Sequence, residues 1–447
     1  MLTEANNKTL TQTAAGTPMG DLLRRYWYPI AAVAELEEKA TKRVRLLGEN
    51  LVLYKDLGGR YGLVDRHCPH RRADMAFGFA EECGLRCHYH GWLFNEEGRC
   101  LEQPFDDTVD PSSRYKDKTP IKAYPVEAKA GLLWAYMGPK PAPLLPDWEP
   151  FNWKNGFVQI VFSAIPCNWF QCQENSIDPV HFEWMHANWG GVRLKGKIGP
   201  YGAKHVKVGF EEFDYGYVYK RVREDTDENN PLWSVGRVCL WPNCLFTGGH
   251  FEWRVPVDDE NTLSVGWFFN RVPKDREPYV QNSIPYWIGP VTDEKTGEWL
   301  TGGVMNQDFA AWIGQGVIAD RSQEHLARSD RGITMIRNRF FEDMETIAKG
   351  GDPKAIIREA KINSSVPLPI VGRKLFIEGL TREEMLKVNV SDNVSPTRFV
   401  FQQGQPEHVR RAYEEAMGFK MEDGFAVSEA LAGYARNKVR PDGSSAA

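Results

Sequence analysis

The sequence predicts an α+β protein in which a small all-β domain precedes a larger domain of antiparallel strands and helices. Three observations support this prediction. Short apolar runs joined by turns fill residues 43–136, prolines crowd residues 139–146, and longer alternating strands followed by helical segments occupy the rest of the chain. We expect an N-terminal helical segment at residues 1–26, the all-β domain at 27–146, the second domain at 147–439 and a flexible tail at 440–447.

Length and composition favour a cytoplasmic enzyme of two or more domains. The chain has 447 residues, of which 42% are hydrophobic and 26% charged, and its net charge of −5 gives no reason to expect nucleic acid as a partner. No apolar run reaches the roughly 18 residues of a membrane span, and no signal peptide is evident. The eight cysteines are dispersed, unlike the dense pattern of a secreted disulfide protein.

The first domain is predicted to consist of short strands that follow an amphipathic segment at residues 19–27. The Asp-Leu-Gly-Gly sequence at residues 56–59 is typical of a hairpin connection, because aspartate and glycine favour tight turns. The expected strands cover residues 43–47, 51–54, 61–64, 91–94 and 131–136.

The second domain is predicted to combine an antiparallel sheet with helices laid across it. The expected strands cover residues 157–162, 215–223, 233–241, 250–255 and 263–270. The expected helices cover residues 318–329, 333–348, 353–360 and 406–417.

Two cysteine–histidine pairs in the first domain are the strongest chemical signal. Cys68 and His70 form a CxH pair, and after 16 further residues Cys87 and His90 form a CxxH pair. Two thiolates and two imidazoles on paired loops are the ligand set of a Rieske [2Fe-2S] centre, with the cysteines on one iron and the histidines on the other. Zinc could also use these four ligands, but the turn and aromatic residues that follow both pairs favour the cluster.

Other histidines and cysteines lie near the four predicted ligands but outside their register. His67 and His88 are expected to pack or to hydrogen-bond near the cluster. Cys83 and Cys100 are expected to be ordinary buried thiols.

A second pair of histidines opens the larger domain. His181 and His186 are five residues apart, so a straight α-helix would separate them by about 140° and they could share one metal only if the helix were distorted. Pro179 predicts a bend at this point. Two histidines and a carboxylate form the facial triad of mononuclear non-haem iron. The alternative is a pair of hydrogen-bonded histidines on a core helix, which the neighbouring Rieske pattern disfavours.

The carboxylate of such a triad need not be local in the sequence. Asp308 stands among apolar and amide side chains, and an aspartate buried there must be paired or bound to a metal. Glu174, Asp178 and Glu183 are competing candidates. Glu324 and His325 are expected to be solvated on a charged helix.

These motifs together resemble the oxygenase (α) component of the Rieske non-haem iron oxygenases. The resemblance is closest to the phthalate-dioxygenase-like branch, which includes aryl-ether O-demethylases acting on lignin-derived biaryl acids. It covers most of the chain and includes the residues at 16–20, 24–29, 307–308 and 316–321 in addition to the two ligand motifs.

The resemblance implies a role for each matching residue. Cys68, His70, Cys87 and His90 would bind the [2Fe-2S] cluster, and His181, His186 and Asp308 would bind the catalytic Fe(II), where O2 is the co-substrate. Asp178 would carry electrons between subunits by bridging an iron-ligand histidine to a cluster histidine of a neighbouring chain, although it could also cap the helix that follows Pro179. The resemblance further implies a homotrimer or a hexamer of two trimers, and a helix-grip form for the catalytic domain.

The electrons must come from a separate protein, because the sequence has no evident flavin- or nicotinamide-binding motif. The resemblance implies a reductase, with or without a ferredoxin, that draws electrons from NAD(P)H. Arg66, Arg71, Arg72 and Arg86 could steer its docking or could simply be solvated charges.

The sequence says less about the substrate. Arg221, Arg223 and Arg237 lie on predicted strands, and an arginine that points inward would pair with an aromatic carboxylate. We therefore favour O-demethylation or monooxygenation of a carboxylated aromatic, with cis-dihydroxylation as the alternative. Two readings from other classes are an electron carrier and a zinc-stabilised binding protein without catalytic activity. Neither accounts for both ligand sets.

Overall fold

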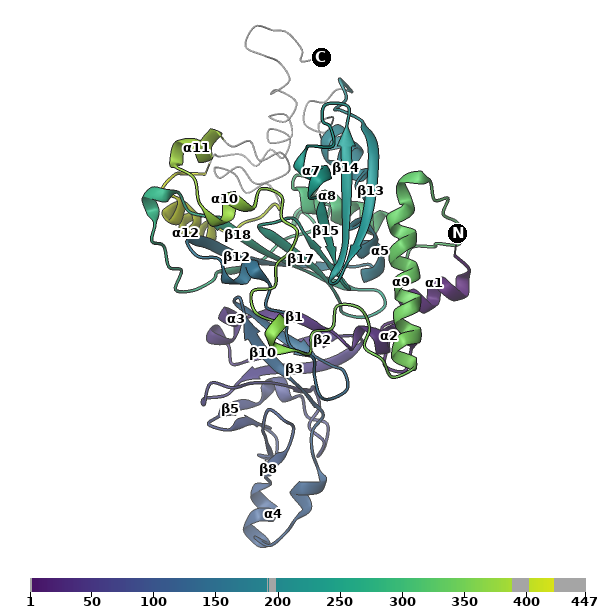
Figure 1. Cartoon of the computed structure of the whole chain (residues 1–447). Helices are drawn as coiled ribbons and strands as arrows, with labels where there is room; N and C mark the ends of the chain where they lie inside the picture. Colours follow the sequence, from purple (N-terminus) through teal and green to yellow (C-terminus); the bar gives the residue numbers. More distant parts are fainter. Residues whose placement is uncertain (1, 191, 193–197, 388–401, 422–447) are drawn as a thin grey trace.

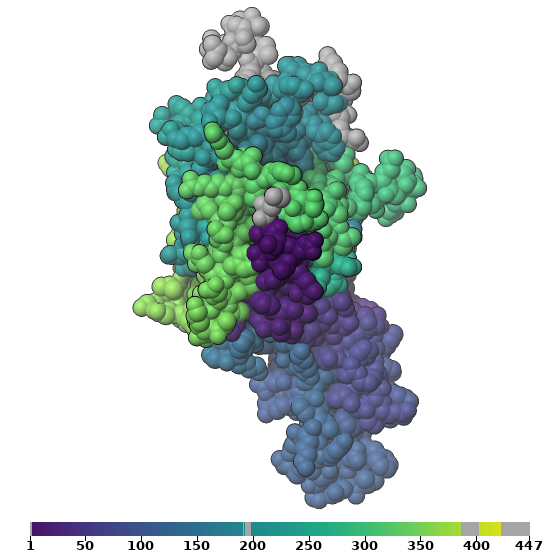
Figure 2. Space-filling view, turned by 90° about the vertical axis from the view of Figure 1, so that its right-hand side faces the viewer, coloured from purple at the N-terminus to yellow at the C-terminus, as the bar shows by residue number. Residues whose placement is uncertain are grey.

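The computed structural model describes residues 2–190, 192, 198–387 and 402–421, so the tail predicted at residues 440–447 lies outside the described residues. A slender β domain stands on one side of a larger sheet-and-helix body (Figure 1). From the side, this first domain projects away from the body (Figure 2). None of the described helices is both long and apolar enough to cross a membrane.

The first domain contains three small antiparallel sheets, with strand orders β1-β11-β10, β2-β3-β4-β9 and β5-β6-β7-β8. Its strands are β1 (Trp27–Ala32), β2 (Thr41–Leu46), β3 (Glu49–Lys55), β4 (Tyr61–Asp65), β5 (Phe79–Glu81), β6 (Gly84–Arg86), β7 (Leu93–Phe94), β8 (Cys100–Glu102), β9 (Ala123–Tyr124), β10 (Val126–Lys129) and β11 (Leu132–Tyr136). Its helices and 3₁₀ turns, with those of the N-terminal segment, are α1 (Glu4–Thr11), α2 (Pro18–Leu23), α3 (Val33–Glu38), η1 (Met75–Phe77), α4 (Pro104–Val109) and η2 (Tyr115–Lys118).

Tight turns set the registers of these hairpins. Leu47 and Gly48 join β2 to β3 with φ angles of 49° and 80°, and this pair of positive φ angles suits the twist of a two-residue hairpin. The connection at residues 56–59 is the predicted turn, in which the Asp56 carboxylate accepts a hydrogen bond from the Arg60 backbone N–H (2.8 Å). All five predicted strands of this domain are present, with ends shifted by up to two residues.

The second domain is built on one eight-stranded sheet, in the order β13-β14-β15-β16-β17-β18-β12-β19. Neighbouring strands are antiparallel, except that β19 runs parallel to β12 at one edge. The strands are β12 (Gly156–Ile165), β13 (His205–Phe213), β14 (Gly216–Arg223), β15 (Arg237–Leu240), β16 (Cys244–Phe246), β17 (His250–Pro256), β18 (Thr262–Arg271) and β19 (Tyr286–Ile288).

Two helices of this domain, the π-helix η4 (Phe182–Trp189) and α8 (Val304–Gly314), carry residues of the candidate metal site. The other helices are α5 (Trp169–Asn175), α7 (Pro231–Ser234), α9 (Arg331–Ala348), α10 (Arg373–Ile377), α11 (Arg382–Lys387) and α12 (Glu407–Met417), with 3₁₀ turns η3 (Glu149–Asn152), η5 (Lys274–Arg276), η6 (Arg328–Asp330) and η7 (Ala360–Ile362). The long helix α9 lies beside α1 and α2 (Figure 1).

Aromatic side chains join the two domains. Trp134 on β11 meets Trp253 on β17 edge to face, with ring centroids 5.1 Å apart, and both rings belong to one continuous core. Such pairs contribute about 0.5–1.5 kcal/mol beyond the area that they bury. Part of the high tryptophan content is therefore used in this junction.

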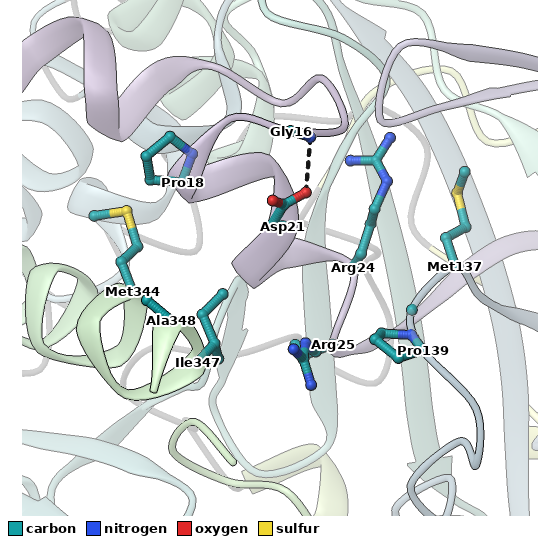
Figure 3. A pocket seen from close by; sticks show the side chains of 11 residues that line it. Gly16, Pro18, Asp21, Arg24, Arg25, Met137, Pro139, Met344, Ile347 and Ala348 are labelled. Carbon is teal, nitrogen blue, oxygen red and sulfur yellow. Dashed lines mark hydrogen bonds between the residues drawn. The ribbon is translucent and has the colours of Figure 1, made fainter. Parts of the chain in front are cut away.

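The N-terminal segment links the two domains on one side. The buried Arg24 guanidinium donates to the backbone oxygens of Thr13 (2.7 Å) and Leu47 (3.0 Å), while α2 packs on α9. A groove of about 580 Å³ lies between α2, α9 and the end of β11. Figure 3 shows Asp21 at this groove, where its carboxylate accepts a hydrogen bond from the Gly16 backbone N–H (2.8 Å).

Two predicted helices of the second domain were wrong, and one predicted strand is shorter than expected. Residues 318–327 form turns and irregular backbone, because the Asp320 carboxylate accepts hydrogen bonds from the backbone N–H and the hydroxyl of Ser322 and so competes with a helix. Residues 353–360 are not helical either, since Ala355 has a left-handed φ of 66°. The strand expected at residues 233–241 starts only at Arg237, after the helical turn α7.

Candidate metal centres

The four cysteine and histidine residues of the first domain lie on two turns of matching geometry. In the first turn the Cys68 N–H donates to the Ala73 carbonyl (2.9 Å), and in the second the Cys87 N–H donates to the Trp92 carbonyl (2.8 Å). Each turn contains one left-handed residue, Arg72 in the first and Gly91 in the second. The two turns belong to the β5–β8 end of the domain, which is the end farthest from the larger body (Figure 1).

The cysteines and histidines of these turns differ in exposure. The Cys68 and Cys87 side chains are buried, whereas His70 and His90 are exposed with ring centroids 4.4 Å apart. His70 stacks on Trp92 at 4.6 Å, which fixes the orientation of its ring. Partial burial and the neighbouring His90 lower the pKa of His70, so its imidazole is neutral and able to bind a metal.

The two thiols are close enough to share a proton. A hydrogen bond from Cys68 lowers the pKa of Cys87 to about 5, and the same interaction raises the pKa of Cys68. One thiolate therefore forms readily at neutral pH, and thiolate is the form that binds metals.

The four side chains are paired by type. The Cys68 and Cys87 thiols lie within hydrogen-bond reach of each other, and the His70 and His90 rings lie 4.4 Å apart. This pairing suits a Rieske centre, in which two thiolates bind one iron and two imidazoles bind the other.

The neighbouring residues that lie out of register behave in different ways. His67 contacts the Arg72 carbonyl oxygen through its Nδ1 (3.0 Å), and His88 meets Phe77 edge to face, as expected for packing residues. Cys100 is buried as predicted, but the prediction for Cys83 was wrong because this thiol is exposed in the turn between β5 and β6.

The arginines near these turns are not equivalent. Arg66 pairs with Asp74 (2.8 Å), and Arg86 pairs with Glu102 (2.7 Å) as well as with Glu81. Arg71 and Arg72 are exposed, and Arg71 lies over the ring of Tyr89.

In the second domain, three side chains converge from two helices. Asp308 Oδ1 on α8 lies 3.4 Å from His186 Nε2 on the π-helix and 3.7 Å from His181 Nε2 just before it. His186 and Asp308 are buried and His181 is half-buried. This is the residue set of a facial triad, and 121 residues of sequence lie between His186 and Asp308.

The helix that holds both histidines is distorted, as their spacing requires. Residues 182–189 form a π-helix, in which the backbone hydrogen bonds join residues five apart. Residues 181 and 186 therefore lie on one side, and their ring centroids are 5.2 Å apart. The distortion is a π-helix that follows Pro179 rather than a simple proline bend.

Polar neighbours fix the histidine rings. His186 Nδ1 lies 2.8 Å from Gln307 Oε1, so it donates its N–H there and leaves Nε2 for a metal. Burial disfavours a charged His186, but Asp308 outweighs burial and raises the pKa of this histidine. Burial likewise opposes the Asp308 charge, yet His186 holds the pKa of Asp308 below its usual value. A bound cation would replace the attraction between a protonated His186 and the Asp308 carboxylate.

The competing acids have other partners. Glu174 accepts hydrogen bonds from the buried guanidinium of Arg321, including one of 2.6 Å, and pairs also with Arg337. Glu183 pairs with His205 (2.9 Å). Glu324 pairs with Arg337 and lies in a non-helical segment, so the prediction of a solvated helical residue was wrong, whereas His325 is exposed.

Asp178 lies on the other side of His181 from Asp308. Its Oδ2 is 3.4 Å from His181 Nδ1, and its Oδ1 accepts a hydrogen bond from the Val180 backbone N–H (2.8 Å). The N-cap of the π-helix is His181, so Asp178 precedes the cap. Burial opposes its charge, but the hydrogen bond with His181 lowers the pKa of Asp178 overall.

A cavity of about 30 Å³ adjoins the triad. His181, Asp308 and Arg237 line it together with His250 and Glu252 from β17. Arg237 on β15 pairs with Tyr219 on β14, so the two side chains lie on the same face of the sheet. Arg221 is two residues after Tyr219 on β14 and therefore lies on that face as well. The Arg221 and Arg237 guanidiniums lie 4.4 Å and 4.8 Å from the Phe182 ring centroid.

Of the three predicted substrate residues only Arg237 lines this cavity; Arg221 and Arg223 do not, and Arg223 lies 3.4 Å from Asp225. The sequence interpretation overlooked His250 and Glu252. Their signal is the alternation of polar residues with Phe251 and Trp253 along β17, because such alternation turns one face of a strand toward a polar site.

Comparison with known proteins gives the following matches. Residues 26–125 match the family model for the Rieske [2Fe-2S] domain. The chain is 63% identical to the 5,5'-dehydrodivanillate O-demethylase oxygenase subunit of Sphingobium sp. (strain NBRC 103272 / SYK-6), over 93% of this chain and 97% of that protein. It is 30% identical to the phthalate 4,5-dioxygenase oxygenase subunit of Pseudomonas putida, over 78% of this chain and 88% of that protein.

Solved structures share the fold at lower identity. The oxygenase in a reduced complex with ferredoxin, from carbazole 1,9a-dioxygenase, is 20% identical with a TM-score of 0.50. The match covers 75% of this chain and 93% of that one. The architecture of a β domain followed by a larger sheet-and-helix domain is therefore a known one.

Proposed function

The chain belongs to the Rieske oxygenases, as the oxygenase subunit of a multicomponent system, and we propose that it removes a methyl group from a methoxylated aromatic acid. The observation that carries this proposal is the His181, His186 and Asp308 set, of which two members are buried and His181 is half-buried, beside a cavity that Arg237 lines. The 63% identity to a protein named as an aryl O-demethylase subunit supports the choice of reaction.

The two candidate metal centres divide the work. We assign the cluster to a domain spanning residues 27–146 and the mononuclear Fe(II) to a domain spanning residues 147–439. The proposed cluster ligands are Cys68, His70, Cys87 and His90, and the proposed iron ligands are His181, His186 and Asp308. Iron held by two histidines and one carboxylate keeps open positions for O2, and the cluster supplies single electrons.

The overall reaction balances with O2 and two electrons. One aryl methyl ether, one O2, two electrons and two protons give one phenol, one formaldehyde and one water. One oxygen atom is inserted into a C–H bond of the methoxy carbon, and the resulting hemiacetal breaks down to the phenol and formaldehyde. The other oxygen atom leaves as water. The protein must hold the methoxy carbon, rather than a ring carbon, nearest the iron.

Arg237 is the proposed anchor for the substrate carboxylate. Its guanidinium lines the cavity beside the triad, and guanidinium groups bind carboxylates through paired hydrogen bonds. Arg221 lies on the same face beside Phe182 and is the second candidate, whereas Arg223 is the weakest of the three. The cavity of about 30 Å³ holds roughly one water, so an aromatic substrate requires side chains around it to move.

Electron transfer between subunits is proposed to pass through Asp178. The cluster turns belong to the first domain, which extends away from the larger body that contains the triad of the same chain (Figure 1). A neighbouring copy would bring its own cluster to Asp178, which touches His181 (3.4 Å). This arrangement calls for a ring, and we propose a homotrimer or two stacked trimers.

The electrons are proposed to come from NAD(P)H through a separate reductase or ferredoxin. The exposed Arg71 and Arg72 next to the cluster turns offer positive charge for docking an acidic carrier. Arg72 lies 3.9 Å from Asp65, whereas Arg66 and Arg86 pair more closely, at 2.8 Å and 2.7 Å, with acidic residues of their own domain.

Ring cis-dihydroxylation is the second candidate reaction, favoured by the 30% identity to a phthalate dioxygenase subunit. The test is to supply the purified chain with a compatible reductase, NADH and a methoxylated aromatic acid under 18O2. O-demethylation predicts formaldehyde and a phenol in equal amounts. A cis-diol without formaldehyde would establish the second reaction instead.

A further inference from the structure

The π-helix carries a second pair of residues with the same spacing as the two iron-site histidines. Glu183 and Asn188 are five apart, like His181 and His186, and both are buried. Because a π-helix brings residues five apart to one side, each pair forms its own row along the helix. Glu183 follows His181 by two residues, so the Glu183 and Asn188 side chains point to a different side of the helix from His181 and His186.

Both members of this second pair accept hydrogen bonds from one short stretch of chain. The Glu183 carboxylate accepts from the His205 backbone N–H (2.6 Å) and from His205 Nδ1 (2.9 Å). The Asn188 side-chain oxygen accepts from the Gly202 backbone N–H (2.8 Å). The stretch from Gly202 to His205 leads directly into β13, so these bonds fasten the helix to the edge of the main sheet.

These contacts distinguish between two forms of the helix. In an α-helix, residues five apart would diverge by about 140°, so Glu183 and Asn188 could not both reach the same stretch, and His181 and His186 could not share a metal. In the π-helix, Glu183 and Asn188 both reach the stretch from Gly202 to His205, and His181 and His186 lie on one side. Since π-helices are rare, other contacts must favour this one over the α-helical form.

We propose that Glu183 and Asn188 are positioning residues that hold the helix in its π form, so that His181 and His186 face one iron. The inference rests on the proposed function, because it presumes an iron at that site. Neither residue lines the cavity beside the triad, so each acts through the histidines rather than on the substrate.

The test is ferrous-ion binding by the full-length protein after its mononuclear iron has been removed. The double variant E183A/N188A is expected to bind ferrous ion about 10- to 100-fold more weakly, which is the usual cost of losing partners that orient metal ligands. The visible spectrum of the Rieske cluster should be unchanged. The single variant Glu183→Gln should bind ferrous ion nearly as tightly as the parent, because its amide oxygen still accepts a hydrogen bond from the His205 backbone N–H.

Amide hydrogen exchange supplies a reading that does not depend on iron. In the metal-free protein, peptides covering residues 181–190 should lose protection in E183A/N188A relative to the parent. The matched control is Glu277→Ala, which removes an ion pair with Arg271 (2.7 Å) at the end of β18 and none of the contacts of Glu183 or Asn188. It should leave both ferrous-ion affinity and exchange at residues 181–190 unchanged.

The outcomes separate this inference from the function it rests on. If the parent binds ferrous ion and E183A/N188A binds it equally well with unchanged exchange, the positioning role is wrong and the proposed function stands. Equal weakening in Glu277→Ala would also overturn the positioning role, because the loss would then reflect general destabilisation. A parent that takes up no ferrous ion beyond its cluster would remove both proposals.

Discussion

The two candidate metal centres of this chain are built in opposite ways. The four proposed ligands of the first domain lie within 23 residues, on two matching turns, and the histidines are exposed. The three proposed ligands of the second domain come from two helices that are far apart in the sequence, and the site is largely buried. An exposed centre can exchange electrons with a partner, whereas a buried one can exclude water from a reaction with O2. The difference in construction therefore matches a difference in task.

The sharpest test of this comparison is to remove one ligand from each centre. Asp308→Ala is expected to abolish turnover and lose the mononuclear iron, because two histidines alone hold Fe(II) poorly, while the cluster spectrum persists. His90→Ala is expected to abolish turnover and lose the cluster colour, while the mononuclear site still binds added ferrous ion. Metal analysis and visible spectra of both variants check this. Loss of both metals from either variant would show that the centres are not independent.

Asp178→Asn tests the proposed connection between the two centres. The amide keeps the size of the side chain and leaves both metals bound, but it cannot take up a proton from a histidine. We expect turnover to fall by roughly 100-fold or more, a typical contribution of a group that handles a proton. The check is steady-state turnover together with metal content. Normal turnover in this variant would remove the bridging role.

Arg237→Gln tests the substrate side of the buried centre. A hydrogen-bonded contact with a charged group contributes about 1.5–3 kcal/mol, so KM for a carboxylated substrate should rise about 10- to 150-fold with a smaller change in kcat. The methyl ester of the same substrate should show little difference between parent and variant. Arg223→Gln is the matched control, since Arg223 lies outside the cavity. An unchanged KM in Arg237→Gln would direct attention to Arg221.

Cys83→Ser has the smallest expected effect of these substitutions. It tests whether the CxH and CxxH spacing alone identifies the cluster ligands. Cys83 is an exposed thiol only four residues before Cys87, but it lies out of register with the CxxH pair. The substitution should leave cluster content, colour and turnover as in the parent. Loss of the cluster would mean that the ligand set has been assigned to the wrong cysteine.

The same contrast explains what the sequence could predict. The turns around Cys68 and Cys87 are local, so the spacing of their residues was sufficient to predict the Rieske domain, which the family model matches over residues 26–125. Helix α8, which carries Asp308, was not predicted, because it is buried on several sides and its apolar residues show no clear helical period. Asp308 was predicted instead because it is an acidic residue among apolar neighbours. The neighbours of this one residue were therefore more informative than the hydrophobic pattern of its helix.

Long-range contacts account for most of what the sequence missed. Residues 318–324 carry Arg321 into a buried network with Glu174 and Arg337, and no local pattern reveals that partnership. The spacing of His181 and His186 required a distorted helix, but the π form depends on bonds to Gly202 and His205 from a separate segment. Local turns could be predicted, whereas contacts between distant elements had to be observed.

The measurement that tests the central claim most directly is an anaerobic reductive titration of the purified chain, with visible and EPR spectra, iron and acid-labile sulfide determined on the same sample. Two different iron centres in one chain predict about three irons and two sulfides per chain, with a rhombic signal averaging near g ≈ 1.9 in the reduced protein. Asp308→Ala should lower the iron to about two and leave the sulfide unchanged. A colourless, sulfide-free protein that contains zinc would contradict the account.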